Sequence, residues 1–239
     1  MSNVELFRFA DDHGVAQAAA EQWTQQLETA ILAPRPCCVA LSGGRIARRF
    51  FESVVGLDRE HRHLLDSVHF FWGDERCVPP TDSECNFAVA RELLLAPLSI
   101  AQEKIHRVRG EAPPESAAAQ AEAELRLIAP VDDSGQPVLD LIFLGLGEDG
   151  HVASLFPGES EKVVTGEVVY RAVIATKPPP CRITLGYPTI AAARQVWVLA
   201  SGPGKGNALR ESLAPDGRTP LARVLRLRRQ TRIFTDIAK

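Results

Sequence analysis

The chain has 239 residues, 45% of them hydrophobic and 24% charged, and its formal net charge is -3. We therefore expect a single soluble globular domain that spans residues 1–239. No apolar run approaches the roughly 18 residues that a membrane span needs. Residues Met1 to Asp12 lack the basic start and the apolar core of a signal peptide, so we expect a cytoplasmic protein.

Strand-like and helix-like segments alternate along the chain, which predicts an α/β fold with an open, mostly parallel, Rossmann-like sheet covered by helices on both faces. A stripe of apolar residues at every fourth position predicts the first helix: Val15, Ala19, Trp23, Leu27 and Ile31. Further helices are expected over 84–95 and 115–128, and strands over 37–41, 68–72, 138–144, 168–175 and 195–200. The loops at 110–114 and 130–137 are too short to be domain linkers.

The five cysteines are an odd number without a C-x-x-C pair, which favours reduced, buried thiols over disulfides or a zinc site. Cys37 and Cys38 are adjacent in an expected strand and should point to opposite faces. His61 and His63 are spaced to share a metal, but two histidines in a charged loop are more often solvated. We therefore expect no metal site.

The arginine-rich stretch 218–232 is interleaved with apolar residues at Leu221, Val224, Leu225 and Leu227. This pattern indicates an amphipathic element with a solvated basic face rather than a nucleic-acid-binding surface. We expect no nucleic-acid partner, and nothing in the sequence indicates an obligate protein partner.

The most informative segment is the glycine-rich turn from Gly145 to Gly158, which directly follows the most hydrophobic stretch, Val138 to Leu144. Ligands in open α/β folds lie beyond the ends of such strands, so His151 should stand at the mouth of a pocket. A histidine can remove a proton from water near neutral pH without a metal. Asp149 and Glu148 are close enough to orient its ring. The alternative is that His151 only caps the turn.

Residues 145–150 also match the G-x-G-x-x-G spacing of dinucleotide-binding turns. Two carboxylates in the turn would repel a pyrophosphate, and the motif lies past the middle of the chain, so a nicotinamide cofactor is not expected. Lys205 resembles a P-loop lysine, but the glycine that a P-loop requires upstream is absent. The sequence therefore predicts no cofactor.

Several expected strand ends carry groups that suit an anionic ligand. The Ser42-Gly43-Gly44 turn leaves backbone N–H groups uncovered before a helix, although a plain tight turn has the same sequence. Four cationic residues follow or flank strands, namely Arg45, Arg76, Arg182 and Lys205. Each alone is typical of a solvated surface charge, whereas together they predict a cationic pocket for a phosphate.

Taken in order, four blocks of the chain resemble the 6-phosphogluconolactonase family, within a wider group that includes glucosamine-6-phosphate deaminase: Ser42-Gly43-Gly44, Asp74-Glu75-Arg76 with Asn86, Gly145 to Gly158, and Arg182-Ile183-Thr184-Leu185 with Lys205. The resemblance extends over nearly the whole chain. It implies a phosphorylated sugar lactone as substrate, His151 as the base that activates water and Asp149 as its partner. It also implies substrate-binding roles for Ser42, Gly43, Gly44, Arg45, Asp74, Glu75, Arg76, Asn86, Gly147, Arg182 and Lys205.

The chain departs from the family pattern at Ile46-Ala47, where the family usually has Thr-Pro, and at Cys85 and Val152, which replace a serine and a threonine. A deaminase would have a tyrosine in place of Arg76 and an Asn-Glu pair before the Pro-Gly that follows its histidine. A third interpretation, a non-catalytic sugar-phosphate-binding module, would normally carry a DNA-binding segment. Because no G-x-S-x-G motif is present, we expect direct attack by water without a covalent intermediate.

Overall fold

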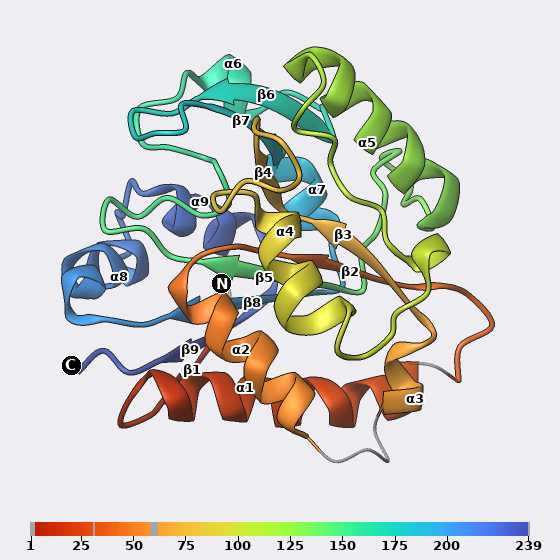
Figure 1. The fold of residues 1–239 in the computed structure, drawn as a ribbon. Helices are drawn as coiled ribbons and strands as arrows, with labels where there is room; N and C mark the ends of the chain where they lie inside the picture. The colour runs from red at the N-terminus through yellow and green to blue at the C-terminus, as the bar shows by residue number, and fades with distance from the viewer. Residues whose placement is uncertain (1–2, 31, 58–61, 239) are drawn as a thin grey trace.

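The computed structural model describes residues 3–30, 32–57 and 62–238, and its centre is a parallel six-stranded sheet (Figure 1). The strand order is β1-β9-β8-β5-β2-β3, and every neighbouring pair is parallel. The strands are β1 (Asn3–Arg8), β2 (Cys37–Leu41), β3 (Val68–Trp72), β5 (Leu141–Gly145), β8 (Gln195–Ala200) and β9 (Gln230–Thr235). The α/β prediction of a mostly parallel sheet is confirmed.

Helices cover both faces of this sheet (Figure 1). One face carries α1 (Asp12–Ala30) and α2 (Arg45–Gly56), and the short α3 (Arg62–Leu65) lies beside α1. The other face carries α7 (Tyr187–Ala192), α8 (Gly206–Leu213) and α9 (Pro220–Leu227). None of the helices in the described ranges is long and apolar enough to cross a membrane.

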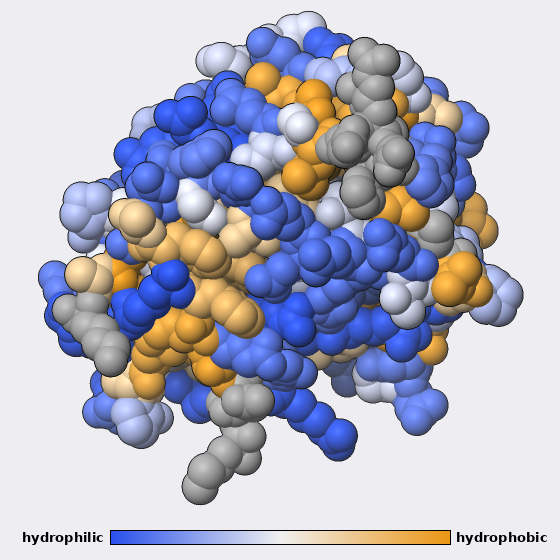
Figure 2. Space-filling model, turned by 90° about the horizontal axis from the view of Figure 1, so that it is seen from below, coloured by the Kyte–Doolittle hydropathy of each residue, from blue (hydrophilic) through white to orange (hydrophobic). Residues whose placement is uncertain are grey.

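The first helix is amphipathic, as its sequence predicts. Val15, Ala19, Trp23 and Leu27 are buried, and Ile31 lies outside the described residues. The outer face of the helix is formed by His13, Gln17, Glu21, Gln25 and Glu28, which are exposed. Seen from below, this side of the molecule is hydrophilic over much of its area, with hydrophobic residues gathered at the lower left and toward the top (Figure 2). Burial of the apolar stripe against the sheet holds the helix in place.

Aromatic side chains form the centre of the core between α1, α2 and the sheet. The Phe143 ring centroid lies 5.4 Å from that of Trp23, 4.5 Å from that of Phe50 and 5.7 Å from that of Trp197. A strand buried on both faces reads as a continuous hydrophobic run, which explains why 138–144 is the most apolar stretch of the chain. Cys37 and Cys38 are also buried, and desolvation raises the pKa of each thiol to about 12.

A second, antiparallel sheet stands beyond the first, in the order β4 (Asp74–Arg76), β7 (Cys181–Leu185), β6 (Tyr170–Ile174). The helix α5 (Pro114–Ile128) packs against it. The prediction that 168–175 joins the main sheet is therefore wrong. Apolar composition identifies a strand but not its partner, and the partner strand β7 contains Arg182, which the sequence placed before an element rather than inside one.

The remaining elements are short. The expected helix over 84–95 begins as α4 (Asn86–Ala90) and continues as a π-helical turn, η2 (Arg91–Leu95). Single turns form at η3 (Gln102–Lys104), α6 (Glu161–Val164) and η4 (Pro203–Lys205).

The basic stretch 218–232 contains α9 and the start of β9, a strand that the sequence analysis did not predict. Leu221, Val224 and Leu225 are buried as expected for an amphipathic element, but one arginine is not solvated. Arg228 is only 7% exposed, and its guanidinium donates to the carbonyl oxygens of Ile190 and Ala193, both at 2.8 Å. These carbonyls belong to the end of α7, so Arg228 satisfies acceptors that a helix terminus leaves free.

Candidate active site

A cleft of about 120 Å³ lies at the carboxyl ends of β2 and β5, facing the second sheet. This is the edge of a parallel sheet at which ligands bind in α/β proteins. Predicted and unpredicted residues line it together: Ser42, Gly43, Gly44, Arg45, Ile46, Asp74, Arg76, Gly145, Leu146, His151, Ala153, Arg182 and Lys205. The fold therefore brings eight of the eleven expected substrate-binding residues and His151 to one cleft.

His151 and Asp149 form a close pair within the turn that follows β5. The Nδ1 atom of His151 lies 2.5 Å from Oδ1 of Asp149, and the same oxygen accepts the backbone N–H of His151 at 3.2 Å. The pair fixes the imidazole with Nδ1 as donor, so Nε2 is the nitrogen that can accept a proton. Burial alone would raise the pKa of Asp149, but the hydrogen bond from His151 and the electrostatic interaction with its ring outweigh burial, and the net pKa is lowered. The carboxylate therefore stays ionised beside the ring.

Two glycines make this pair possible. A Cβ atom on Gly147 would lie 2.0 Å from Nδ1 of His151 and 2.7 Å from Oδ1 of Asp149. Gly150 adopts a φ of +82°, and a Cβ there would meet the Thr219 side chain at 2.5 Å. Gly147 thus leaves room for the His151–Asp149 pair and does not itself line the cleft.

The wall formed by β4 holds a buried carboxylate. Asp74 is 4% exposed, and its Oδ2 accepts the hydroxyl hydrogen of Ser154 at 2.7 Å. Ser154 is fully buried and was not singled out in the sequence, although it stands three residues after His151 in the same glycine-rich block. The preceding residue, Ala153, has a φ of +50°, a left-handed conformation that is rare for a residue with a side chain and marks a constrained turn.

Asn86 and Glu75 lie behind the cleft and not in it. The Nδ2 group of Asn86 donates to the backbone oxygen of Asp74 at 2.9 Å, and a Cβ on Gly43 would collide with Oδ1 of Asn86 at 1.9 Å. Asn86 therefore sets the position of the Ser42 to Gly44 turn.

Glu75 is fully buried and accepts the backbone N–H groups of Asn86 at 2.7 Å and Phe87 at 2.8 Å, at the start of α4. Burial raises the pKa of Glu75 to about 7, in spite of these hydrogen bonds. Its carboxylate acts as a cap for the helix, which removes it from direct contact with a ligand in the cleft.

The four cationic side chains fall into two pairs. Arg76 and Arg182 are partners in the β4–β7 ladder. Arg182 is 7% exposed, lies over the Phe156 ring at 5.7 Å, and has its pKa lowered first by desolvation and then by the charge of Arg76. The Nε of Arg76 is buried without a hydrogen-bond partner in the part of the chain that the structure describes. Two guanidinium groups held together at a cleft favour an anionic ligand.

Arg45 and Lys205 form the second pair, at the start of α2 and in the turn after β8. Desolvation and the charge of Arg45 lower the pKa of Lys205. The turn is held by Asp236, which accepts the Ser201 hydroxyl at 2.7 Å and the Gly202 N–H at 2.9 Å. The N-terminus of α2, the uncovered turn and these two cations together make a site suited to phosphate.

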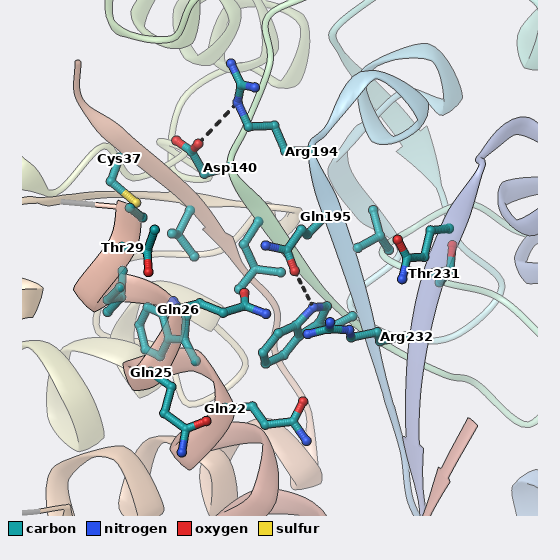
Figure 3. A pocket seen from close by; sticks show the side chains of 18 of the residues that line it. Gln22, Gln25, Gln26, Thr29, Cys37, Asp140, Arg194, Gln195, Thr231 and Arg232 are labelled. Atoms are coloured by element: carbon teal, nitrogen blue, oxygen red, sulfur yellow. Dashed lines mark hydrogen bonds and ion pairs between the residues drawn. The ribbon is translucent and has the colours of Figure 1, made fainter. Parts of the chain in front are cut away.

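A larger cavity of about 810 Å³ lies elsewhere, at the start of the strands (Figure 3). Gln22, Gln25 and Gln26 of α1 stand on one side of it, and residues of β8 and β9, among them Gln195, Thr231 and Arg232, on the other (Figure 3). Its charged groups are paired: Asp140 binds Arg35 at 2.6 Å and Arg194 at 3.4 Å, and Arg232 binds Glu5 at 2.9 Å. This cavity lies at the amino ends of the parallel strands, whereas ligands of open α/β sheets bind at their carboxyl ends.

The residues that the structure describes form no candidate site for a metal ion. Within 3–30, 32–57 and 62–238 no group of three histidine, cysteine, aspartate or glutamate side chains is placed to hold a metal ion. His63 is exposed, and His61 lies outside the described residues, so their pairing on a metal stays untested.

The comparisons with known proteins agree with this architecture. Residues 10–234 match the family described as glucosamine-6-phosphate isomerases/6-phosphogluconolactonase. The chain is similar to the 6-phosphogluconolactonase of Treponema pallidum, with 40% identity over 182 residues that cover 74% of this chain and 72% of that protein. The corresponding Streptomyces coelicolor protein is 33% identical over 219 residues, covering 89% and 84% of the two chains.

Among solved structures, the 6-phosphogluconolactonase from Trypanosoma brucei aligns with a TM-score of 0.83 and 28% identity, over 98% of this chain and 96% of that one. The family match covers β2 to β8, nearly all of β9, the cleft and the histidine-bearing turn in a single span, and only β1 lies before it. The chain therefore belongs to the family of glucosamine-6-phosphate isomerases and 6-phosphogluconolactonases.

Proposed function

We propose that this protein is a carboxylic ester hydrolase that converts 6-phospho-D-glucono-1,5-lactone to 6-phosphogluconate in the cytoplasm, without a cofactor. The observation that carries the proposal is the His151–Asp149 pair, 2.5 Å apart, at a cleft lined by four cationic side chains. A base beside a cationic cleft suits a neutral lactone that carries a phosphate. The names of the similar proteins from Treponema pallidum and Streptomyces coelicolor support the same activity.

In the first step, Nε2 of His151 takes a proton from a water molecule, and the water oxygen attacks the lactone carbonyl carbon. The ionised Asp149 accepts from Nδ1 and stabilises the imidazolium that forms. The carbonyl becomes an oxyanion, for which the glycine-turn N–H groups and the arginines are the candidate partners. In the second step the ring C–O bond breaks, the ring oxygen takes the proton from Nε2, and His151 returns to its starting state.

The substrate phosphate is expected at the Ser42 to Gly44 turn and Lys205, where N–H groups, the α2 N-terminus and an ammonium group converge. Arg45, Arg76 and Arg182 are the other cationic side chains that line the cleft. One carboxylate oxygen of Asp74 accepts the hydroxyl hydrogen of Ser154, and Asp74 also lines the cleft. This placement suits a hydrogen bond from a sugar hydroxyl to the Asp74 carboxylate. Glu75, Asn86 and Gly147 then support the site without touching the sugar.

The test is the hydrolysis rate of freshly generated 6-phosphogluconolactone, corrected for spontaneous hydrolysis, in the wild-type protein and in His151→Ala. The exposed His63 provides the matched control, as His63→Ala. We expect loss of at least about a hundredfold in His151→Ala, the usual contribution of a general base, and a normal rate in His63→Ala.

A wild-type rate equal to background would contradict the proposal. Release of ammonia from glucosamine-6-phosphate would replace it with a deaminase. A trapped acyl-enzyme would retain the activity but overturn direct attack by water.

A further inference from the structure

Two cysteines outside the cleft are neighbours in the second sheet. The ladder pairs Arg76 with Arg182, so the next antiparallel pair along it is Cys77 with Cys181, and the Cys77 N–H donates to the Cys181 oxygen at 3.0 Å. Burial, and then the neighbouring Cys181 thiol, raise the pKa of the Cys77 thiol. Both residues are half-buried, whereas Cys37, Cys38 and Cys85 are buried.

The backbone geometry of such a pair is compatible with a disulfide. Hydrogen-bonded residues in antiparallel strands have Cα atoms about 5.5 Å apart. Disulfides join Cα atoms that are about 4.4–6.8 Å apart. The general expectation that the thiols of this chain stay unlinked therefore does not extend to this pair.

The position of the pair relates it to the cleft. Side chains alternate across a strand, so Cys77 and Cys181 lie on the opposite face of β4 and β7 from Arg76 and Arg182. Both arginines line the cleft. The chain also turns away directly after Cys77, where the Val78 N–H donates to the Arg76 oxygen at 2.8 Å, so this ladder ends at the two sulfurs.

We propose that Cys77 and Cys181 are a redox pair, and that the disulfide they form with a low-molecular-weight disulfide as oxidant weakens anion binding in the cleft. Cross-strand Cβ atoms about 5.5 Å apart must approach to about 4 Å to form the bond. Drawing the strands together on the cysteine face splays the side chains on the opposite face. The guanidinium groups of Arg76 and Arg182 then separate and no longer meet one phosphorylated ligand together.

The chemistry is two consecutive exchanges. The thiolate of either cysteine attacks one sulfur of the reagent, forms a mixed disulfide and releases one thiolate. The other cysteine loses its proton to solvent and attacks the protein sulfur of the mixed disulfide, which releases the second thiolate. Two protein thiols are oxidised, the reagent is reduced to two small thiols, and the second exchange accelerates as the pH rises.

The first measurement is a count of free thiols in the denatured, acid-quenched protein after incubation with oxidised glutathione at pH 8.5. We expect the wild-type protein to fall from five thiols to three, with a linked Cys77–Cys181 peptide, and to recover on reduction. Cys77→Ser and Cys181→Ser should form no internal disulfide. Retention of five thiols, or a disulfide between other cysteines, would overturn the proposal that Cys77 and Cys181 form a redox pair.

The second measurement is the affinity of the reduced and oxidised protein for 6-phosphogluconate by calorimetry. We expect a severalfold weaker affinity after oxidation in the wild type and no change in Cys77→Ser. Equal affinities in the two redox states would overturn the effect on the cleft. The affinity measurement rests on the proposed function, whereas the thiol count does not. A protein that forms the disulfide but binds no 6-phosphogluconate in either state would contradict the proposed ligand and not the redox pair.

Discussion

The imidazole of His151 occupies the space that a side chain on Gly147 would need. A Cβ on Gly147 would lie 2.0 Å from Nδ1 of His151, far inside van der Waals contact. The hydrogen bond between His151 and Asp149 therefore depends on a glycine two residues before the carboxylate. This relationship links the backbone of the turn to the basicity of the base.

The substitution Gly147→Ala should remove most of the activity. The methyl group displaces the imidazole from Asp149, and a displacement of about 1 Å can reduce a catalysed rate by up to about a hundredfold. The loss should appear mainly in kcat, measured as lactone hydrolysis in the folded variant. Gly56→Ala is the matched control, because a Cβ on Gly56 meets nothing within 4 Å. Equal activity of the two variants would contradict this role of Gly147.

Asp149→Asn should lower kcat by about two to four orders of magnitude with a small effect on KM. The amide keeps the shape of the side chain, but it no longer stabilises the imidazolium and it favours the other tautomer of the ring. The comparison of kcat and KM at a fixed pH checks this. A large rise in KM with an unchanged kcat would instead place Asp149 in substrate binding.

Gly43→Ala should weaken substrate binding, and removal of Asn86 should restore part of it. The new Cβ would collide with Oδ1 of Asn86 at 1.9 Å and shift the Ser42 to Gly44 turn. In the double variant Gly43→Ala, Asn86→Ala the collision is gone. We expect the KM of the double variant to lie below that of Gly43→Ala. Strictly additive effects in this double-mutant cycle would show that the contact does not position the turn.

Protein stability should fall between about pH 6.5 and pH 4 because of His69. Its ring lies in a chain of hydrogen bonds, with Lys104 Nζ at 3.1 Å on one side and His106 at 2.9 Å on the other, and His106 continues to Glu124 at 2.9 Å. Desolvation, followed by the charges of Lys104 and His106, lowers the pKa of His69 from 6.5 to about 4. In this window the unfolded chain binds a proton at His69 that the folded protein does not, so acid favours unfolding.

Urea denaturation at pH 7, 5.5 and 4.5 measures this dependence. The free energy of unfolding of wild-type protein should decrease with each step. His69→Gln has no titrating ring at this position, so its decrease over the same steps should be smaller. Parallel pH dependences for the two proteins would assign the acid sensitivity to other groups.

The parts of the protein that could be predicted from the sequence are those whose structure depends on residues close together in the chain. The run 138–144 and the stripe on α1 are local patterns, and each identifies an element whose type does not depend on distant partners. The turn after β5 carries the proposed base, the carboxylate that pairs with it and the glycine that both require. A local group of residues of this kind can be recognised from the sequence alone.

Only the tertiary structure shows which strands pair and which side chains contact one another. The sequence could not place β6 and β7 in a second sheet, because strand pairing joins residues that are remote along the chain. Nor could it assign Glu75 to the start of α4, since adjacent carboxylates at 74 and 75 differ only in the face of β4 from which they project. Ser154, Asn86 and the Cys77–Cys181 pair acquire their roles in the same way. The sequence determined the class of fold and the chemistry of the turn, and long-range packing decided which side chains meet the cleft.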